Sequence, residues 1–191
     1  RLDGVTGVQT CALPISVNRA AVRVARKAAG PDIYVAGSVG PCLRPGQILT
    51  ADNEKELVAA FDEQIAALVS EGVDLLVLET FCDPEELRIA ARLARAAGAP
   101  VMASFTVGAG GETARGLPLE KMVALLDADA SVDIVGMNCG IGPAAMYDAL
   151  ERAVPLTRKP FVVMPNAGLP RQVEGRMLYL TNPEYFTEYA K

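Results

Sequence analysis

Chemically capable side chains recur in this sequence at the points where apolar runs end. Glu79 follows the run DLLVL, and Asn138 and Cys139 follow the run VDIVGM. Gly37 and Ser38 lie at the equivalent place in an earlier run, DIYVAGSVG. A carboxylate can bind a cationic group, and a cysteine thiolate is both a nucleophile and a ligand for soft metals. The pattern therefore predicts one polar site built from the ends of several strands.

The roles of the two most reactive residues are open at this level. Glu79 follows an apolar strand, so its carboxylate is expected to be largely desolvated and to need a partner. That partner is either a cationic group of a substrate or a loop arginine such as Arg115. Cys139 is either a metal ligand or nucleophile, or a small buried residue, because free cysteines often simply pack in cores.

Three further residues near strand ends are weaker candidates. Cys42 and Cys82 lie in loops just beyond two of the apolar runs and could share an edge with Cys139. Asn166, in the segment PNAG, either faces the site or stabilises a turn, since asparagine tolerates turn conformations. The glycine-rich segment GAGGETARG (108–116) lacks the Lys-Ser/Thr of a phosphate loop, so we expect a mobile loop over the mouth of the site.

Composition excludes several kinds of chemistry. The 191 residues contain no histidine, which rules out Ser-His-Asp and Cys-His catalysis and every histidine metal site. The formal net charge is −5, and without a basic cluster this disfavours nucleic acids and anionic membranes as partners. No apolar run approaches the roughly 20 residues that span a bilayer.

The four cysteines, Cys11, Cys42, Cys82 and Cys139, form no C-x-x-C pair. Because no signal peptide precedes them, they do not indicate a disulfide framework. We therefore expect a cytoplasmic protein with reduced thiols.

Apolar runs alternate with amphipathic segments along the chain. This predicts an α/β fold with a parallel sheet, and strand starts recur about every 32 residues, the spacing of a (β/α)8 barrel. A doubly wound open sheet is the second choice, but no G-x-G-x-x-G follows an early strand. The expected strands span 32–40, 73–80, 100–107, 132–139 and 160–168, and the expected helices span 17–30, 53–72, 83–98, 117–128, 143–154 and 182–191.

The first residues fit none of this pattern. The segment GVTGVQTCALPIS (4–16) resembles the translation of a common sequencing-library adapter. We therefore expect residues 1–16 to be an assembly artefact and residues 17–191 to be the native domain. The alternative is a native N-terminal loop.

Five segments, in order, resemble the homocysteine S-methyltransferase family. They are GSVGP (37–41), LLVLETF (75–81), PVMASFTV (100–107), GMNCGIGP (136–143) and PNAGLP…EGR…Y…NPEYF (165–186). The family includes the homocysteine-binding barrel of cobalamin-dependent methionine synthase and of the betaine enzyme. The wording of the last two segments is most similar to bacterial enzymes that join this barrel to a methylenetetrahydrofolate reductase. A fused or associated reductase domain is therefore an expected partner.

The resemblance implies a partial (β/α)8 TIM barrel holding about strands three to seven of eight. In the family, a zinc ion held by three cysteines binds the homocysteine sulfur as a thiolate, which attacks an activated methyl group to give methionine. Cys139 matches one zinc ligand, and Glu79 matches the glutamate that holds the homocysteine amino group. Gly37, Ser38 and Asn138 match positions around the bound amino acid.

Two motifs of the family have no counterpart here. The adjacent cysteines of Gly-Gly-Cys-Cys-Gly are absent, and LDGVTGV (2–8) only imitates the first-strand motif Asp-Gly-x-x-Gly-Thr, so Asp3 receives no role. We therefore expect an incomplete barrel that neither holds stoichiometric zinc nor turns over homocysteine alone, because catalytic zinc needs three protein ligands.

Several alternatives stay open. The methyl donor could be methyltetrahydrofolate, methylcobalamin, S-methylmethionine, S-adenosylmethionine or betaine, all of which serve within the family. A metal-free barrel enzyme would instead use Glu79 as base and Cys139 as nucleophile. A degenerate barrel would act only as a binding or assembly module.

Overall fold

Five parallel strands form one sheet in which every strand pairs with the next strand along the chain. The computed structural model describes residues 12–44, 46–168, 171–178 and 182–190. The strands are β1 (Ala36–Val39), β2 (Leu75–Phe81), β3 (Val101–Phe105), β4 (Ile134–Asn138) and β5 (Phe161–Met164). This order confirms the barrel prediction, because a doubly wound sheet reverses its strand order at a switch point.

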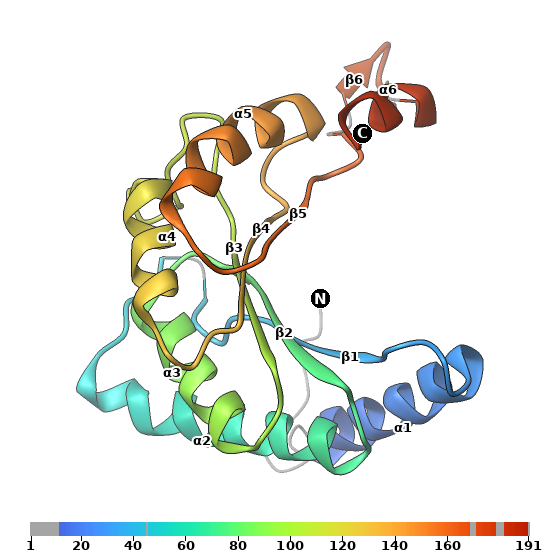
Figure 1. Cartoon of the computed structure of the whole chain (residues 1–191), viewed down its shortest axis with the longest axis vertical. Helices are drawn as coiled ribbons and strands as arrows, with labels where there is room; N and C mark the ends of the chain where they lie inside the picture. Colours follow the sequence, from blue (N-terminus) through green and yellow to red (C-terminus); the bar gives the residue numbers. More distant parts are fainter. Residues whose placement is uncertain (1–11, 45, 169–170, 179–181, 191) are drawn as a thin grey trace.

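Helices connect the strands, and α2 to α5 lie along one face of the sheet (Figure 1). Each expected helix is present, and Asp83 caps α3 as expected by accepting the N–H groups of Glu85 and Glu86. No described helix is long and apolar enough to cross a membrane. The helices are α1 (Ala12–Ala29), α2 (Ala51–Ser70), α3 (Pro84–Ala96), α4 (Leu119–Ala128), α5 (Pro143–Ala153) and α6 (Pro183–Tyr189), with a 3-10 turn η1 (Val154–Leu156) after α5.

The N-terminal boundary differs from the expectation. Helix α1 begins at Ala12, five residues before the helix that the pattern predicts, and so includes part of the expected adapter segment 1–16. Residues 1–11, including Cys11, lie outside the described residues. The origin of residues 1–16 stays a prediction.

The hydrophobic core lies between the sheet and the helices. Leu76 and Leu78 of β2 and Phe105 of β3 are fully buried there, together with Phe61 and Ile65 of α2. Neighbouring residues on the same strands, such as Val77 and Glu79, are only half-buried because successive side chains point to opposite faces. The face opposite the helices therefore carries the candidate site residues at its carboxyl end.

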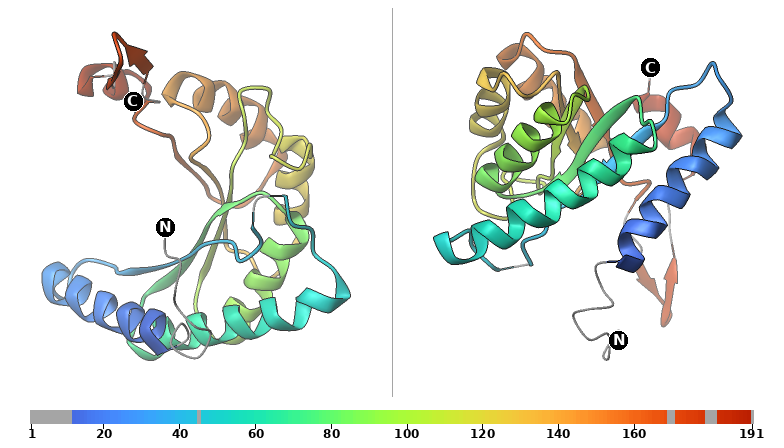
Figure 2. Two further views of the ribbon diagram at one scale, coloured as in Figure 1. Left: turned by 180° about the vertical axis from the view of Figure 1, so that it is seen from behind. Right: turned by 90° about the horizontal axis from the view of Figure 1, so that it is seen from below.

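A short antiparallel hairpin follows β5, and the sequence pattern did not predict it. Its strands are β6 (Arg171–Val173) and β7 (Arg176–Leu178). The turn residues Glu174 and Gly175 both have positive φ, at 49° and 78°, as a type I′ turn requires. Strands of three residues are too short to show alternation, so only the Glu-Gly turn could have revealed the hairpin. The right view of Figure 2 shows the hairpin extending away from α6.

The amino end of the sheet is held by a repeated ionic contact. Asp74 Oδ2, just before β2, accepts the N–H of Val35 and a guanidinium N–H of Arg26 from α1, each at 2.6 Å. Asp133, just before β4, accepts the N–H that begins β3 at 2.8 Å and pairs with Arg95 of α3 at 2.5 Å. Each aspartate ties a strand start to the preceding helix, which assigns this end of the sheet to stability.

Replacing Asp74 by asparagine should remove a pH-dependent part of the stability. The hydrogen bond from Val35 N–H, and then Arg26, hold the pKa of Asp74 below its ordinary 3.8. Such a carboxylate stabilises the fold fully above its ordinary pKa, and the contribution disappears as the pH falls through the lower native value. Urea unfolding from about pH 7 to about pH 2 should show a stability gap to wild type that closes in acid.

The control is Asp62→Asn, on the exposed side of α2. The stability of this variant in urea should match that of the wild type across the same pH range. A gap for Asp74→Asn that stays constant into acid would show that the ion pair contributes nothing that depends on charge.

Candidate functional site

Ser38 and Glu79 meet at the carboxyl end of the sheet, a contact that the sequence pattern did not predict. Ser38 Oγ of β1 donates to Glu79 Oε1 of β2 at 2.5 Å. The expectation that Glu79 is largely desolvated is wrong, because its side chain is half-buried on the face away from the helices. Arg115 pairs with Asp83 instead of Glu79. One oxygen of the Glu79 carboxylate therefore accepts a hydrogen bond from a neutral hydroxyl, and no described cationic side chain pairs with this carboxylate.

Close packing explains why a glycine fits at position 37. A Cβ at this position would lie 3.0 Å from Leu76 Cδ2 and 3.2 Å from Leu68 Cδ1, on the helical side of the sheet. Glycine thus lets α2 and β2 pack close to β1. The predicted contact of Gly37 with a substrate stays a prediction.

Asn138 and Cys139 end β4 at the same edge of the sheet. Asn138 is 1% exposed, whereas Cys139 is half-buried and donates its N–H to Met164 O of β5 at 3.0 Å. Cys139 has a φ of 56°, in the left-handed region. This conformation costs a residue with a side chain about 1–3 kcal/mol. The thiol is therefore held by a strained backbone, which is a feature that clusters at functional sites.

Gly140 lets the loops after β3 and β4 come together. Its φ is 75°, and a Cβ would lie 2.3 Å from Val107 O. Asn166 N–H then donates to Ile141 O at 3.0 Å, which ties the loop after β5 to the same place. The thiol of Cys139 thus lies where three loops converge.

Thr80 is a functional candidate whose role sequence reasoning missed. It lies in an irregularity of the β2–β3 register between Leu78 and Phe81, and its φ is 70°. Its N–H donates to Asn138 Oδ1 at 2.9 Å, and its hydroxyl accepts from Asn138 Nδ2 at 2.8 Å. The local sequence ETF (79–81) gives no sign of this contact, because Asn138 lies 58 positions away.

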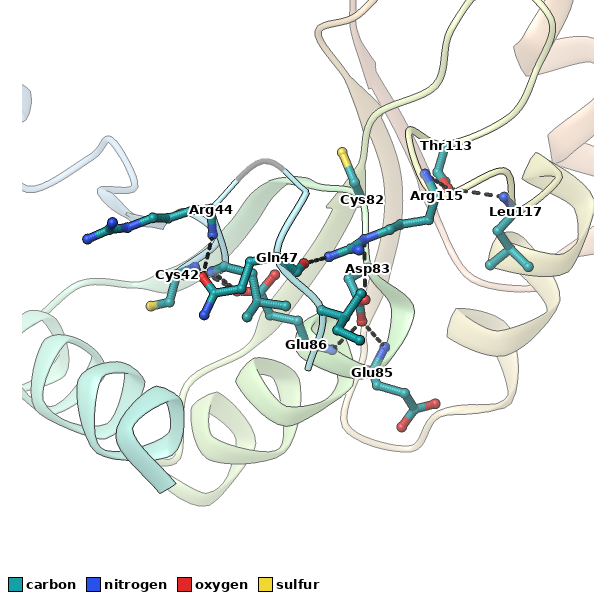
Figure 3. Close-up of polar contacts among 12 residues, drawn as sticks. Cys42, Arg44, Gln47, Cys82, Asp83, Glu85, Glu86, Thr113, Arg115 and Leu117 are labelled. Atoms are coloured by element: carbon teal, nitrogen blue, oxygen red, sulfur yellow. Dashed lines mark hydrogen bonds and ion pairs between the residues drawn. The ribbon is translucent and has the colours of Figure 1, made fainter. Parts of the chain in front are cut away.

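A polar network joins the loops after β1, β2 and β3 (Figure 3). Arg115, from the third loop, pairs with Asp83 at 3.5 Å and donates to Gln47 O in the first loop. Glu86 of α3 accepts the N–H groups of Cys42 and Leu43 at 2.6 and 2.8 Å. These contacts fix the first loop against α3.

Glu86 is unusual because it is a carboxylate with only 1% of its surface exposed. Burial raises the pKa of Glu86, while the two N–H groups that it accepts act in the opposite direction. A nearby carboxylate, Asp83, also raises it, and Arg115 lowers it. The side chain of Glu86 satisfies two backbone donors that the loop would otherwise leave unpaired.

Two cavities open beside this network. The larger, about 520 Å³, is lined by Thr80, Cys82, Leu43 and Arg115 among others. The smaller, about 440 Å³, is lined by residues of the glycine-rich loop and by Gly140. The residue after Glu79 therefore borders one cavity, and the residue after Cys139 borders the other. Both are of a size that a small organic substrate can occupy.

The glycine-rich loop 108–116 has its own hydrogen bonds. Gly108 N–H donates to Glu112 O, and Thr113 N–H donates to Leu117 O, each at 2.9 Å. The Thr113 hydroxyl also accepts the N–H of Leu117 at 3.3 Å. The loop is thus a hydrogen-bonded turn that lines a cavity, and its mobility stays a prediction.

The other cysteines do not form a metal cluster with Cys139 in the described part of the chain. Cys82 Sγ lies 2.9 Å from Thr106 Oγ1, and Cys42 is exposed in the loop after β1. Among the described residues, no group of three or more cysteine or carboxylate side chains is placed to hold a metal ion. Over the described ranges, Cys139 therefore lacks the partners of a three-cysteine metal site.

Comparison with known proteins gives one family. The sequence model described as homocysteine S-methyltransferase matches residues 7–191. Betaine–homocysteine S-methyltransferase 1 of Danio rerio is 34% identical over 145 residues, which are 72% of this chain and 35% of that protein. Methionine synthase of Mycobacterium tuberculosis is 33% identical over 159 residues, which are 78% of this chain and 13% of that protein.

A solved structure matches as well. The metallated form of the homocysteine methyltransferase MmuM from Escherichia coli superposes with a TM-score of 0.67 and 31% identity. The match covers 81% of this chain and 59% of MmuM. This chain therefore spans less than two thirds of the length of each of these relatives.

Replacing Gly140 by alanine should destabilise the fold by about 1–3 kcal/mol, because a methyl group would collide with Val107 O in a left-handed backbone. Urea unfolding measures the loss. The matched control is Gly142→Ala, because a Cβ there meets nothing within 4 Å and its φ is −83°. Equal midpoints for the two variants would contradict the close approach.

Replacing Glu86 by alanine should cost about 1–3 kcal/mol of stability at neutral pH, since the N–H groups of Cys42 and Leu43 lose their acceptor. Glu86→Gln keeps an acceptor oxygen of the same reach and should lose clearly less. Thermal or urea unfolding of both variants gives the comparison. If glutamine destabilises as much as alanine, the charge itself and not the acceptor holds the loop.

Proposed function

Because this chain belongs to the homocysteine S-methyltransferase family, as its motifs indicate, we propose that it forms part of a barrel that transfers a methyl group to homocysteine. The product of that reaction is methionine. The proposal covers residues 17–191 as an incomplete barrel domain, which is consistent with coverage of 59% of MmuM. An activated methyl compound is the second substrate.

The observation that carries the proposal is that a carboxylate and a thiol lie at the same edge of the sheet. Glu79 lies at the end of β2, and Cys139 lies just after β4. Glu79 would bind the ammonium group of homocysteine, and Ser38 would keep the carboxylate oriented through Oε1. A charge-assisted hydrogen bond between the ammonium group and the carboxylate contributes about 1.5–3 kcal/mol to binding. The sulfur of the amino acid would then lie toward Cys139.

Zinc enters the proposal through the family. When bound, zinc lowers the pKa of a coordinated thiol and so makes homocysteine nucleophilic at neutral pH. Cys139 would supply one ligand, and the described residues do not provide the other two. The described part of the chain therefore does not by itself fit a three-cysteine zinc site, and the residues that we assign act through binding and orientation.

The setting of the enzyme is part of the same proposal. The three described cysteines are free thiols, which fits a reducing cytoplasm. A methylenetetrahydrofolate reductase domain, fused or associated, is the proposed partner, on the wording of segments 136–143 and 165–186.

In the full-length enzyme that contains this chain, Glu79→Gln should raise the KM for homocysteine by about tenfold to a hundredfold, because a neutral amide no longer attracts the ammonium group. Its zinc content should not change. Cys139→Ala should instead abolish zinc binding and methyl transfer together. Steady-state kinetics and metal analysis of purified protein measure both effects.

Glu63→Gln on the exposed side of α2 is the control and should match wild type. Full zinc occupancy in the Cys139 variant would refute the ligand assignment. Methionine formation by a wild-type enzyme that contains no metal would favour the metal-free alternative.

A further inference from the structure

Asn138 connects the two halves of the proposed site, although β3 separates their strands. Its Oδ1 accepts the N–H of Thr80 at 2.9 Å, and its Nδ2 donates to Thr80 Oγ1 at 2.8 Å. The same Nδ2 lies 3.4 Å from Cys139 Sγ, within hydrogen-bonding distance of a sulfur atom. One amide therefore contacts both the residue that follows Glu79 and the thiol of Cys139.

The amide has little capacity left for a substrate. An asparagine side chain has two N–H donors and an oxygen with two lone pairs. Asn138 uses both donors and one lone pair on Thr80 and Cys139. Its side chain is also almost completely buried, at 1% exposure. These contacts favour an action through its neighbours over direct contact with homocysteine.

The two neighbours have backbones that need external support. Thr80 and Cys139 both have left-handed φ values, 70° and 56°, which non-glycine residues rarely adopt. Strained residues of this kind persist only where the surrounding structure holds them. Asn138 supplies that support to Thr80 through two hydrogen bonds and to Cys139 through its sulfur.

Thr80 and Glu79 lie in the same irregularity of the sheet. The β2–β3 register shifts between Leu78 and Phe81, and the irregularity includes both Glu79 and Thr80. A bulge re-aims the side chains beside it. Asn138 binds this irregularity through both the N–H and the hydroxyl of Thr80, so it restrains the direction of Glu79 from two strands away.

We propose that Asn138 and Thr80 form a positioning pair that fixes Glu79 and Cys139 relative to each other. The inference rests on the proposed function, in which Glu79 binds the amino group of homocysteine and Cys139 lies at its sulfur. The pair sets the distance between these two points and acts on the reaction through Glu79 and Cys139.

A double-mutant cycle in the full-length enzyme tests the link to Glu79. Thr80→Val removes the hydroxyl but keeps the side-chain shape and the N–H, and it should raise the homocysteine KM by about tenfold with a smaller change in kcat. In a Glu79→Gln background, Thr80→Val should change the homocysteine KM by less than about twofold, because the carboxylate that Thr80 positions is absent. Thr80→Ser, which keeps the hydroxyl, should recover the wild-type KM.

The outcomes separate the two claims. If Glu79→Gln leaves the homocysteine KM unchanged, the proposed role of Glu79 fails. If Glu79→Gln raises KM but Thr80→Val has no effect, or has its full effect in both backgrounds, only the positioning pair fails. Circular dichroism and thermal unfolding of each variant exclude a loss of folding as the cause.

A second measurement tests the link to Cys139 in the present chain, without substrate or metal. Asn138→Asp keeps the side-chain shape and replaces the donor at the sulfur by an acceptor oxygen. Iodoacetamide should then alkylate Cys139 at least about threefold more slowly at neutral pH, because the attacking sulfur loses an N–H contact and faces a carboxylate oxygen instead. Mass spectrometry follows each cysteine, and Cys42 is the internal control. If the ratio of the alkylation rates of Cys139 and Cys42 is the same in the variant and in the wild type, Asn138 does not act on the Cys139 sulfur.

Discussion

The in-order parallel pairing of five strands is the constraint on which the rest of this structure depends. Because all five strands run in the same direction, every carboxyl end lies at one edge of the sheet and every amino end at the other. Ser38, Glu79 and Asn138 come from three strands and reach that edge only through this pairing. The resulting assembly is the arrangement expected for part of a (β/α)8 barrel.

The two ends of the sheet are stabilised differently. At the amino end, Asp74 and Asp133 repeat one design, in which an aspartate binds a strand N–H and an arginine of the preceding helix. At the carboxyl end, Arg115 and Glu86 hold irregular loops through backbone groups. Loops have few repeated hydrogen bonds of their own, so single buried side chains must satisfy them. The amino end thus carries ionic contacts that stabilise the sheet, whereas the carboxyl end combines loop-stabilising contacts with the proposed site.

The carboxyl end also stores strain. Thr80 and Cys139 adopt left-handed backbones, and Gly140 follows in the same region of φ. Such conformations are retained where a site requires them and its neighbours can hold them. Here the buried amide of Asn138 contacts both strained residues. The proposed homocysteine site would therefore be preorganised before substrate arrives, which is how binding sites limit the entropy lost on association.

Much of the fold could be predicted from local sequence. Apolar runs and helical periodicity predicted all five strands of the parallel sheet and all six α-helices, and Asp83 and Pro143 marked the helix starts. Among the described residues, the hairpin and the 3-10 turn η1 were not predicted, because elements of three residues carry no periodic signal. Family motifs then predicted Glu79 and Cys139 as site residues, since these motifs are short stretches of consecutive residues that follow apolar runs.

The partners of these residues were decided by tertiary structure alone. Glu79 binds Ser38 across 41 positions and not Arg115, and Asn138 binds Thr80 across 58 positions. An added Cβ at Gly37 would meet side chains on the helical side of the sheet, a packing constraint that the sequence did not reveal. Periodicity and capping act between residues a few positions apart, so the sequence by itself determined the elements and the candidate chemistry. Strand register, the irregularity in β2 and positive φ values depend on the whole sheet, and they determined which atoms meet.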